Sequence, residues 1–138
     1  MSEADLPSSD AASGPASDDD VRVVVVDDDP DVAASIAEAL EFDGYRVRIA
    51  EDGTRALVLI AEFLPHCVLL DVDMPGMSGD ELSALLRERH GDDIVLVAVT
   101  GMREQDARAR GTFGRVDHYL RKPLDLGQLR RLLPRISS

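Results

Sequence analysis

The sequence predicts an α/β fold, a doubly wound (βα)5 sandwich with a five-stranded parallel sheet. The main observation is an alternation of short apolar segments with longer segments in which apolar residues recur at helical spacing. Strands that are apolar throughout are typical of a parallel sheet that helices cover on both faces. A length of 138 residues, of which 44% are apolar, suits one globular domain with a substantial core.

The first strand is predicted at residues 21–26, where a run of valines indicates burial on both faces. A helix is expected from Pro30, because proline suits a first helical turn, and Asp29 suits the N-cap position before it. This helix is expected to end at Asp43–Gly44. Apolar residues at helical spacing form its expected inward face: Val32, Ile36, Ala39 and Leu40.

The second and third strands are predicted at residues 45–50 and 67–70. The helix between them is expected at residues 54–64, because Pro65 ends the pattern. Its expected inward residues are Leu57, Ile60, Ala61 and Leu64. After the third strand, residues 74–79 contain a proline and glycines and are expected to form a loop.

A helix is predicted at residues 80–89, and the fourth and fifth strands at residues 94–99 and 118–121. The expected inward residues of this helix are Leu82, Leu85 and Leu86. A weaker helix, rich in Arg and Ala, is predicted at residues 105–112, and a last helix at residues 125–133. Right-handed crossovers between parallel strands then place helices on both faces of the sheet.

Residues 1–20 are predicted to form a disordered acidic tail, and the folded domain is expected to span residues 21–135. The tail has almost no large apolar residue, so it cannot bury enough surface to offset the entropy of ordering. The net charge of −12 argues against direct nucleic-acid binding, which requires clustered Lys and Arg. No apolar run is long enough for membrane insertion, and the single cysteine, Cys67, fits a cytoplasmic location.

Polar residues stand at the ends of four predicted strands. Asp27 and Asp28 follow the first strand, Asp71 ends the third, Thr100 ends the fourth, and Lys122, the only lysine, follows the fifth. In doubly wound sheets ligands bind beyond the carboxyl ends of the strands. Two carboxylates about 4 Å apart repel by roughly 4 kcal/mol at an effective dielectric near 20. We therefore expect a divalent cation at this edge of the sheet.

Four motifs in this order closely resemble those of the receiver domain of two-component response regulators. They are the acid pair Asp27–Asp28, LLDVDMPGMSG at residues 69–79, VTG at residues 99–101 and YLRKP at residues 119–123. The resemblance extends over residues 21–133 and implies the flavodoxin-like topology. It implies that a sensor histidine kinase or a phosphotransfer protein donates a phosphoryl group, and that the resulting conformational switch controls a downstream protein target in a two-component system or phosphorelay.

The resemblance also assigns roles to individual residues, and their chemistry suits those roles. Aspartate forms aspartyl phosphates, and Mg²⁺ (or Mn²⁺) prefers carboxylate and carbonyl oxygens. A lysine supplies a compact positive charge. The implied assignments are Asp71 as phosphoacceptor; Asp27, Asp28, Asp71 and the backbone carbonyl of Asp73 as metal ligands; Thr100 and Tyr119 as the switch pair; Lys122 as the phosphate contact; and Pro123 as the partner of Lys122 in a cis peptide bond.

Two positions depart from the usual receiver pattern or vary within it. Arg115 stands where receivers usually carry a small residue, so the loop around it is expected to differ. Asp73, two residues after the acceptor, is a variable position in the family and adds another carboxylate beside Asp71.

Two alternative functions stay open. The stretch LLDVDMP also resembles the strand-end Asp-x-Asp motif of haloacid-dehalogenase-like phosphatases, in which the first aspartate is the nucleophile. An inactive receiver-like interaction module is the second alternative. No DNA-binding output domain is expected, because only five residues follow Leu133.

Overall fold

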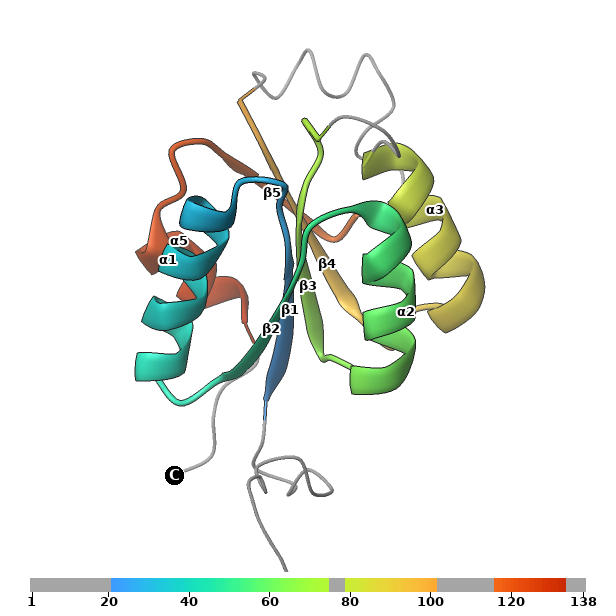
Figure 1. Cartoon of the computed structure of the whole chain (residues 1–138), viewed down its shortest axis with the longest axis horizontal. Helices are drawn as coiled ribbons and strands as arrows, with labels where there is room; N and C mark the ends of the chain where they lie inside the picture. The colour runs from blue at the N-terminus through green and yellow to red at the C-terminus, as the bar shows by residue number, and fades with distance from the viewer. Residues whose placement is uncertain (1–20, 75–78, 102–115, 134–138) are drawn as a thin grey trace, which may run out of the picture.

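The structure is a computed structural model that describes residues 21–74, 79–101 and 116–133. These residues contain a five-stranded parallel sheet with the strand order β2-β1-β3-β4-β5 (Figure 1). The strands are β1 (Arg22–Val26), β2 (Arg46–Ala50), β3 (Cys67–Asp71), β4 (Val95–Thr100) and β5 (His118–Arg121). The helices are α1 (Pro30–Phe42), α2 (Gly53–Phe63), α3 (Gly79–His90) and α5 (Leu126–Leu132). The predicted doubly wound fold is confirmed.

Some predictions concern residues outside the described ranges. These are the acidic tail at residues 1–20, most of the loop at residues 74–79, the helix at residues 105–112 and the loop around Arg115. No element is therefore labelled α4.

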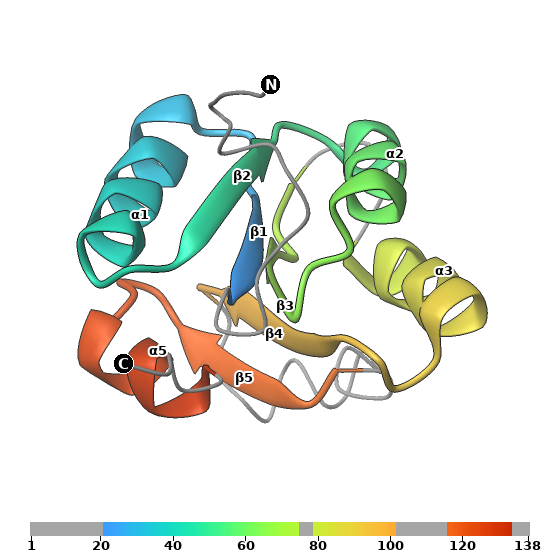
Figure 2. The same cartoon turned by 90° about the horizontal axis from the view of Figure 1, so that it is seen from below.

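Helices cover both faces of the sheet. α1 and α5 lie on one face, and α2 and α3 lie on the other (Figure 1 and Figure 2). All neighbouring strands pair in parallel, so their carboxyl ends share one edge of the sheet, at the top of Figure 1. Among the described residues no helix is long and apolar enough to cross a membrane.

Burial on both faces explains why the central strand β1 is apolar throughout. Val23 and Val25 belong to the core beneath α1 and α5, whereas Val24 and Val26 belong to the core beneath α2 and α3. Successive side chains of a strand point to opposite faces, so a strand covered on both sides needs an apolar residue at every position. The predicted burial of this segment on both faces is confirmed.

Aspartates begin three of the described helices. Asp29 accepts hydrogen bonds from the N–H groups of Asp31 and Val32 at 3.0 and 3.3 Å, and Pro30 follows it in the first turn, as predicted. Asp52 and Asp125 cap α2 and α5 in the same way. These side chains satisfy backbone donors that have no partner within the helix.

The predicted inward faces of α1 and α2 are partly wrong. Val32 is 43% exposed and Leu64 is 57% exposed, whereas the small residues Ala33 and Ala56 are fully buried. The short side chain of alanine lets a helix backbone approach the sheet closely, so the buried stripes include Ala33 and Ala56. Leu64 lies beyond the end of α2 in the left-handed region, with φ 53°, so its side chain no longer follows the helical face. Ala61 is also exposed.

A polar junction ties α3 to the amino ends of β4 and β5. Arg87 donates hydrogen bonds to the carbonyl oxygens of Gly91 and Ile94 at 2.9 and 2.8 Å, and its guanidinium pairs with Asp117. Asp117 also accepts the N–H of Leu96 at 2.8 Å. Burial raises the pKa of Asp117, but the Leu96 N–H and the Arg87 guanidinium outweigh this effect and hold the pKa below its ordinary value.

We expect Asp117→Asn to lower the free energy of unfolding by about 1 kcal/mol near neutral pH. The substitution removes charge-assisted hydrogen bonds, and solvent screening reduces their contribution because the Asp117 side chain is 42% exposed. The pKa of Asp117 is lower in the folded than in the unfolded protein, where it is about 3.9. The contribution is therefore present above that value and is lost as pH falls through the folded-state pKa. Urea unfolding at neutral and acidic pH measures it. The exposed Asp92→Asn is the control, and a loss that is independent of pH would contradict the assignment.

Candidate functional site

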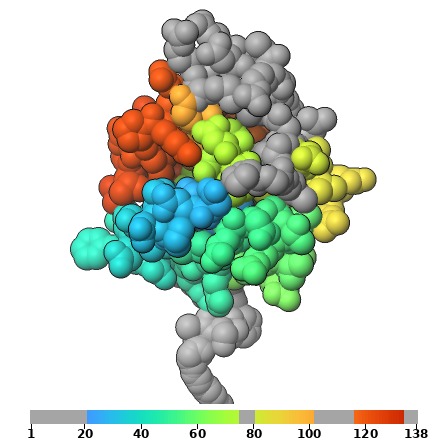
Figure 3. All heavy atoms as spheres, turned by 45° about the horizontal axis from the view of Figure 1, so that its top comes forward, coloured from blue at the N-terminus to red at the C-terminus, as the bar shows by residue number. Residues whose placement is uncertain are grey.

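The carboxyl ends of the strands bring together residues that are far apart in the sequence. Asp71 ends β3 and pairs with Val99 of β4, and Thr100 ends β4. The N–H of Lys122 donates to the carbonyl oxygen of Thr100 at 2.9 Å, which continues the β4–β5 pairing beyond β5. Figure 3 looks onto this end of the molecule, where the β1–α1, β3 and β5–α5 segments meet.

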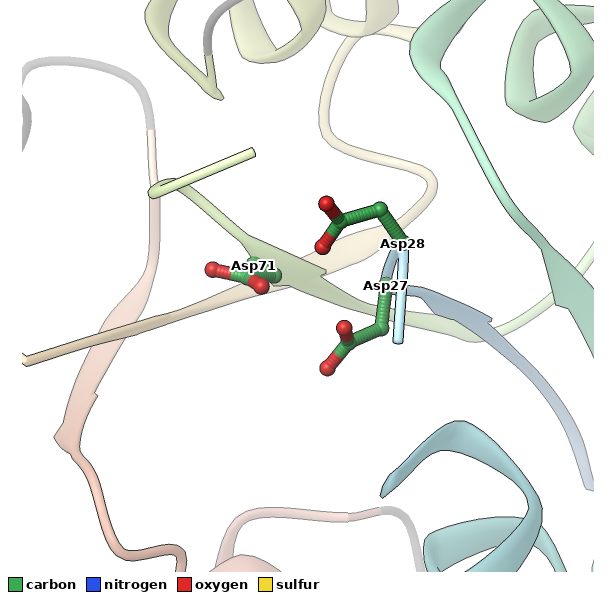
Figure 4. Close-up of side chains that lie close together, drawn as sticks. All are labelled: Asp27, Asp28 and Asp71. Carbon is green, nitrogen blue, oxygen red and sulfur yellow. The ribbon is translucent and has the colours of Figure 1, made fainter. Parts of the chain in front are cut away.

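Three aspartates form an acidic cluster at this edge. Asp27 and Asp28 follow β1, and Asp71 comes from the neighbouring strand β3 (Figure 4). One carboxylate oxygen of each lies within 4.8 Å of the others. Asp27 and Asp71 are buried, whereas Asp28 is exposed, so the cluster opens to solvent on the side of Asp28.

Local hydrogen bonds orient the two buried carboxylates of the cluster. Asp27 Oδ1 accepts the N–H of Asp29 at 2.9 Å, and Asp71 Oδ1 accepts the N–H of Asp73 at 2.9 Å. In both cases the side chain bonds to the backbone two residues further on, which is the pattern of an Asx turn. Each aspartate therefore turns the chain away from its strand and has its carboxylate held in place.

The groups around the acidic cluster do not fully neutralise its negative charge. Burial raises the pKa of Asp27 above its ordinary value, and the charges of Asp71 and Asp28 raise it further. The Asp29 N–H and the Lys122 ammonium lower the pKa but do not cancel these effects. Three converging carboxylates are the hard oxygen ligands that Mg²⁺ prefers. The donor set therefore fits a divalent cation, whose charge would remove the repulsion.

Lys122, which follows β5, contacts Asp71. Its Nζ donates to Asp71 Oδ1 at 3.1 Å and lies 3.6 Å from Asp73 Oδ2. Burial lowers the pKa of Lys122, but the hydrogen bond to Asp71 and the charges of Asp71, Asp73 and Asp27 outweigh it and raise the pKa above its ordinary value. The ammonium thus stays charged. The Lys122–Pro123 peptide bond is cis, as the resemblance implied.

The side chain of Asp73 accepts hydrogen bonds at the end of β4 and contacts the residue that follows β5. The hydroxyl of the buried Thr100 donates to Asp73 Oδ1 at 2.8 Å, and the N–H of Gly101 donates to Asp73 Oδ2 at 2.9 Å. Burial raises the pKa of Asp73, but the Gly101 N–H, the Thr100 hydroxyl and Lys122 outweigh it and lower the pKa below its ordinary value. We call the three donors, Thr100 Oγ1, Gly101 N and Lys122 Nζ, the anion cradle.

A cleft of about 400 Å³ lies over these residues. Its polar lining includes the acidic cluster, Asp73 and Lys122, and its apolar lining includes Val32 and Ile36 of α1 and Leu124 after β5. The exposure of Val32, which contradicts its predicted burial, follows from its place at this cleft. An anionic group that enters the cleft would meet Lys122 on one side and the acidic cluster on the other.

The family model for the response regulator receiver domain matches residues 23–134. The chain belongs to this family. Receiver domains are phosphoacceptor signalling domains rather than enzymes that turn over a separate substrate, and they interact with histidine kinases. This membership replaces the alternative of a haloacid-dehalogenase-like phosphatase.

Curated relatives include longer response regulators. This receiver domain is 42% identical over 121 residues to the response regulator MprA of Mycobacterium sp. strain KMS, covering 85% of this chain and 52% of the relative. It is 40% identical over 109 residues to MprA of Mycobacterium tuberculosis, covering 79% of this chain and 47% of the relative. The chain thus spans about half the length of the curated relatives it matches.

Solved receiver structures have the same fold. The response regulator TrrA of Thermotoga maritima, in complex with Mg²⁺–BeF, is 28% identical with a TM-score of 0.73, covering 81% of this chain and 95% of that one. A response regulator of Burkholderia pseudomallei with a phosphorylated aspartic acid and a calcium ion is 27% identical with a TM-score of 0.74, covering 83% of this chain and 67% of that one.

The structure brings most of the predicted site residues of the receiver domain into contact or close proximity. Asp27, Asp28 and Asp71 form the cluster, and Lys122 contacts Asp71. Tyr119 is half-buried in β5 and pairs with Ala98 in the strand that ends at Thr100. Gly101 and the carboxylate of Asp73 were not predicted to contact each other. The only signal in the sequence was an additional carboxylate beside Asp71.

Proposed function

We propose that this receiver domain accepts a phosphoryl group on Asp71 from a histidine kinase or a phosphotransfer protein and then controls a downstream protein target. One observation carries the proposal: the buried Asp71 carboxylate is clustered with those of Asp27 and Asp28 and also contacts the Lys122 ammonium. The phosphorylated aspartic acid of the Burkholderia pseudomallei regulator supports the same chemistry here. A cytoplasmic location stays a prediction.

In the proposed step a carboxylate oxygen of Asp71 attacks the phosphorus atom of the donor. A new O–P bond forms, and the bond between phosphorus and the donor atom breaks. That atom is an imidazole nitrogen of a phosphohistidine or an oxygen of acetyl phosphate, and it retains the electron pair. Among the described residues, Asp73 N and Lys122 Nζ both donate to Oδ1 of Asp71. We therefore assign the attack to Oδ2.

Positive charge on both sides of the acceptor would stabilise the transferred group. Mg²⁺ (or Mn²⁺), held by Asp27, Asp28, Asp71 and the backbone carbonyl of Asp73, would supply charge that offsets the phosphoryl oxygens. The Mg²⁺–BeF complex of TrrA supports this assignment. Lys122 holds a compact ammonium on the opposite side and orients Asp71 through its 3.1 Å hydrogen bond.

The conformational response is proposed to run through Thr100 and Tyr119. The Thr100 hydroxyl is buried at the end of β4 and already takes part in the anion cradle. Contact with a phosphoryl oxygen would favour one position of Thr100, and Tyr119 in the adjacent strand would respond. A ligand shifts such an equilibrium only through contacts that differ between the two states.

The proposal is tested by incubating the protein with acetyl phosphate and Mg²⁺ and measuring its intact mass. We expect one phosphoryl group per chain, with labelling that is lost in excess chelator. Asp28→Ala should reduce both Mg²⁺ affinity and labelling, on the order of tenfold or more, because it removes a ligand of the metal. Asp31→Asn is the matched control: it removes one charge from the first turn of α1, outside the acidic cluster, and should leave labelling unchanged.

Three outcomes would contradict parts of the proposal. Full labelling of Asp28→Ala, or full labelling of the wild-type protein in excess chelator, would contradict the metal site. A wild-type protein that stays unlabelled by acetyl phosphate and by histidine kinases would support the alternative of an inactive interaction module.

A further inference from the structure

The anion cradle is filled by a side chain of the protein itself. Thr100 and Gly101 each direct a donor to one oxygen of the Asp73 carboxylate, at 2.8 and 2.9 Å. Lys122 Nζ completes the set at 3.6 Å from Asp73 Oδ2. A hydroxyl, a backbone N–H and an ammonium that converge on a carboxylate form a site suited to anionic oxygens.

The cradle is also next to Asp71. The Lys122 ammonium lies between the two carboxylates, because it donates to Asp71 Oδ1 at 3.1 Å and pairs with Asp73. A phosphoryl group attached to Asp71 would bring acceptor oxygens to this ammonium and to the end of β4. A hydroxyl and a backbone N–H each donate a single hydrogen. Thr100 and Gly101 therefore cannot donate full-strength hydrogen bonds to Asp73 and to a phosphoryl group at the same time.

We propose that the Asp73 carboxylate is an internal ligand of the anion cradle and competes with the phosphoryl group on Asp71 for its donors. This inference rests on the proposed function of Asp71. Before phosphorylation, Asp73 accepts the hydrogen of the buried Thr100 hydroxyl, which favours the conformation without phosphate. Phosphorylation requires that the Asp73 carboxylate leave the cradle.

The surroundings of Asp73 permit this exchange. Its side chain is 36% exposed, so the carboxylate can turn into solvent without disrupting the core. The backbone of Asp73 can stay in place, because its N–H donates to Asp71 Oδ1 at 2.9 Å independently of the side chain. Asp73 thus sets how strongly a phosphoryl group is held: the apparent affinity is the intrinsic affinity multiplied by the fraction of molecules in which the cradle is free.

The test measures the affinity of the full chain for beryllofluoride, a phosphoryl mimic, in Asp73→Ala, Asp73→Asn and the control Asp31→Asn. Each titration uses a Mg²⁺ concentration that saturates the variant, because removal of a nearby negative charge also weakens metal binding. We expect Asp73→Ala to bind beryllofluoride on the order of tenfold more tightly than the wild type. Asp73→Asn should be intermediate, because its amide keeps one acceptor oxygen, and Asp31→Asn should match the wild type.

A second readout needs neither metal nor phosphoryl mimic. The Gly101 amide resonance of the metal-free protein should shift upfield in Asp73→Ala, because its hydrogen bond to the carboxylate is lost. Beryllofluoride should then shift it downfield again. An unchanged Gly101 resonance, or equal beryllofluoride affinity in Asp73→Ala and wild type, would overturn the competition and leave the proposed function of Asp71 intact. Absence of beryllofluoride binding and of phosphorylation in all variants would overturn both.

Discussion

Asp71→Asn is expected to abolish phosphorylation by acetyl phosphate and by histidine kinases. The substitution keeps the size of the side chain, and the amide oxygen can still accept hydrogen bonds from the Asp73 N–H and from Lys122. It removes the anionic oxygen that attacks phosphorus, so no aspartyl phosphate can form at this position. Intact mass spectrometry after incubation with acetyl phosphate and Mg²⁺ measures the loss.

The Asp71→Asn variant should remain folded, which makes the result interpretable. Asp71 is buried beside Asp27 and Asp28, so removal of its charge relieves repulsion within the acidic cluster. Its thermal unfolding midpoint should therefore equal or exceed that of the wild type. Asp73→Asn is the matched variant for labelling, since it changes a neighbouring aspartate and should still be phosphorylated. A phosphoryl group found on Asp71→Asn would show that another residue is the acceptor.

Lys122→Arg is expected to separate phosphorylation from the conformational response. Attack depends mainly on Asp71 and the metal, so the variant should still be labelled. The response depends on the compact ammonium that contacts both Asp71 and Asp73, at 3.1 and 3.6 Å. The guanidinium of arginine is larger and planar and cannot replace a point charge in this position. The chemical-shift changes of Thr100 and Tyr119 on addition of beryllofluoride should therefore be largely lost.

The control for this experiment is Arg121→Lys, the opposite exchange at the exposed neighbouring residue. It keeps the charge and leaves the contacts of Lys122 unchanged, so its beryllofluoride response should equal that of the wild type. A complete response in Lys122→Arg would mean that any cation at this position suffices. Loss of labelling in Lys122→Arg would instead assign the lysine to the transfer step.

The elements with the strongest local patterns were predicted well from the sequence. β5 has the predicted bounds, and α1 begins at Pro30 after the predicted Asp29 cap. The alternation of strands and helices predicted the parallel sheet. A parallel sheet in turn predicted that Asp27, Asp71 and Lys122 lie at the same edge. Such inferences succeed because the spacing of apolar residues and the capping of helices both depend on residues close together in the chain.

The faces of the helices were predicted less well, because packing decides which side of an amphipathic stretch lies against the sheet. Val32 and Leu64 were expected to be buried and are exposed, while Ala33 and Ala56 lie in the core. The spacing of apolar residues alone does not show which of them is buried. A large residue near the end of a helix can be exposed, while a small residue is buried where the helix lies closest to the sheet.

By itself, the sequence determined the α/β fold, the edge at which the polar residues gather and the chemistry that they can support. Only the tertiary structure decided that the Asp73 carboxylate takes up the hydroxyl of Thr100 and the N–H of Gly101, which follow it by 27 and 28 residues. No local rule predicts these hydrogen bonds. They depend on the pairing of β3 with β4, which brings the Thr100–Gly101 segment within reach of the side chain that follows β3.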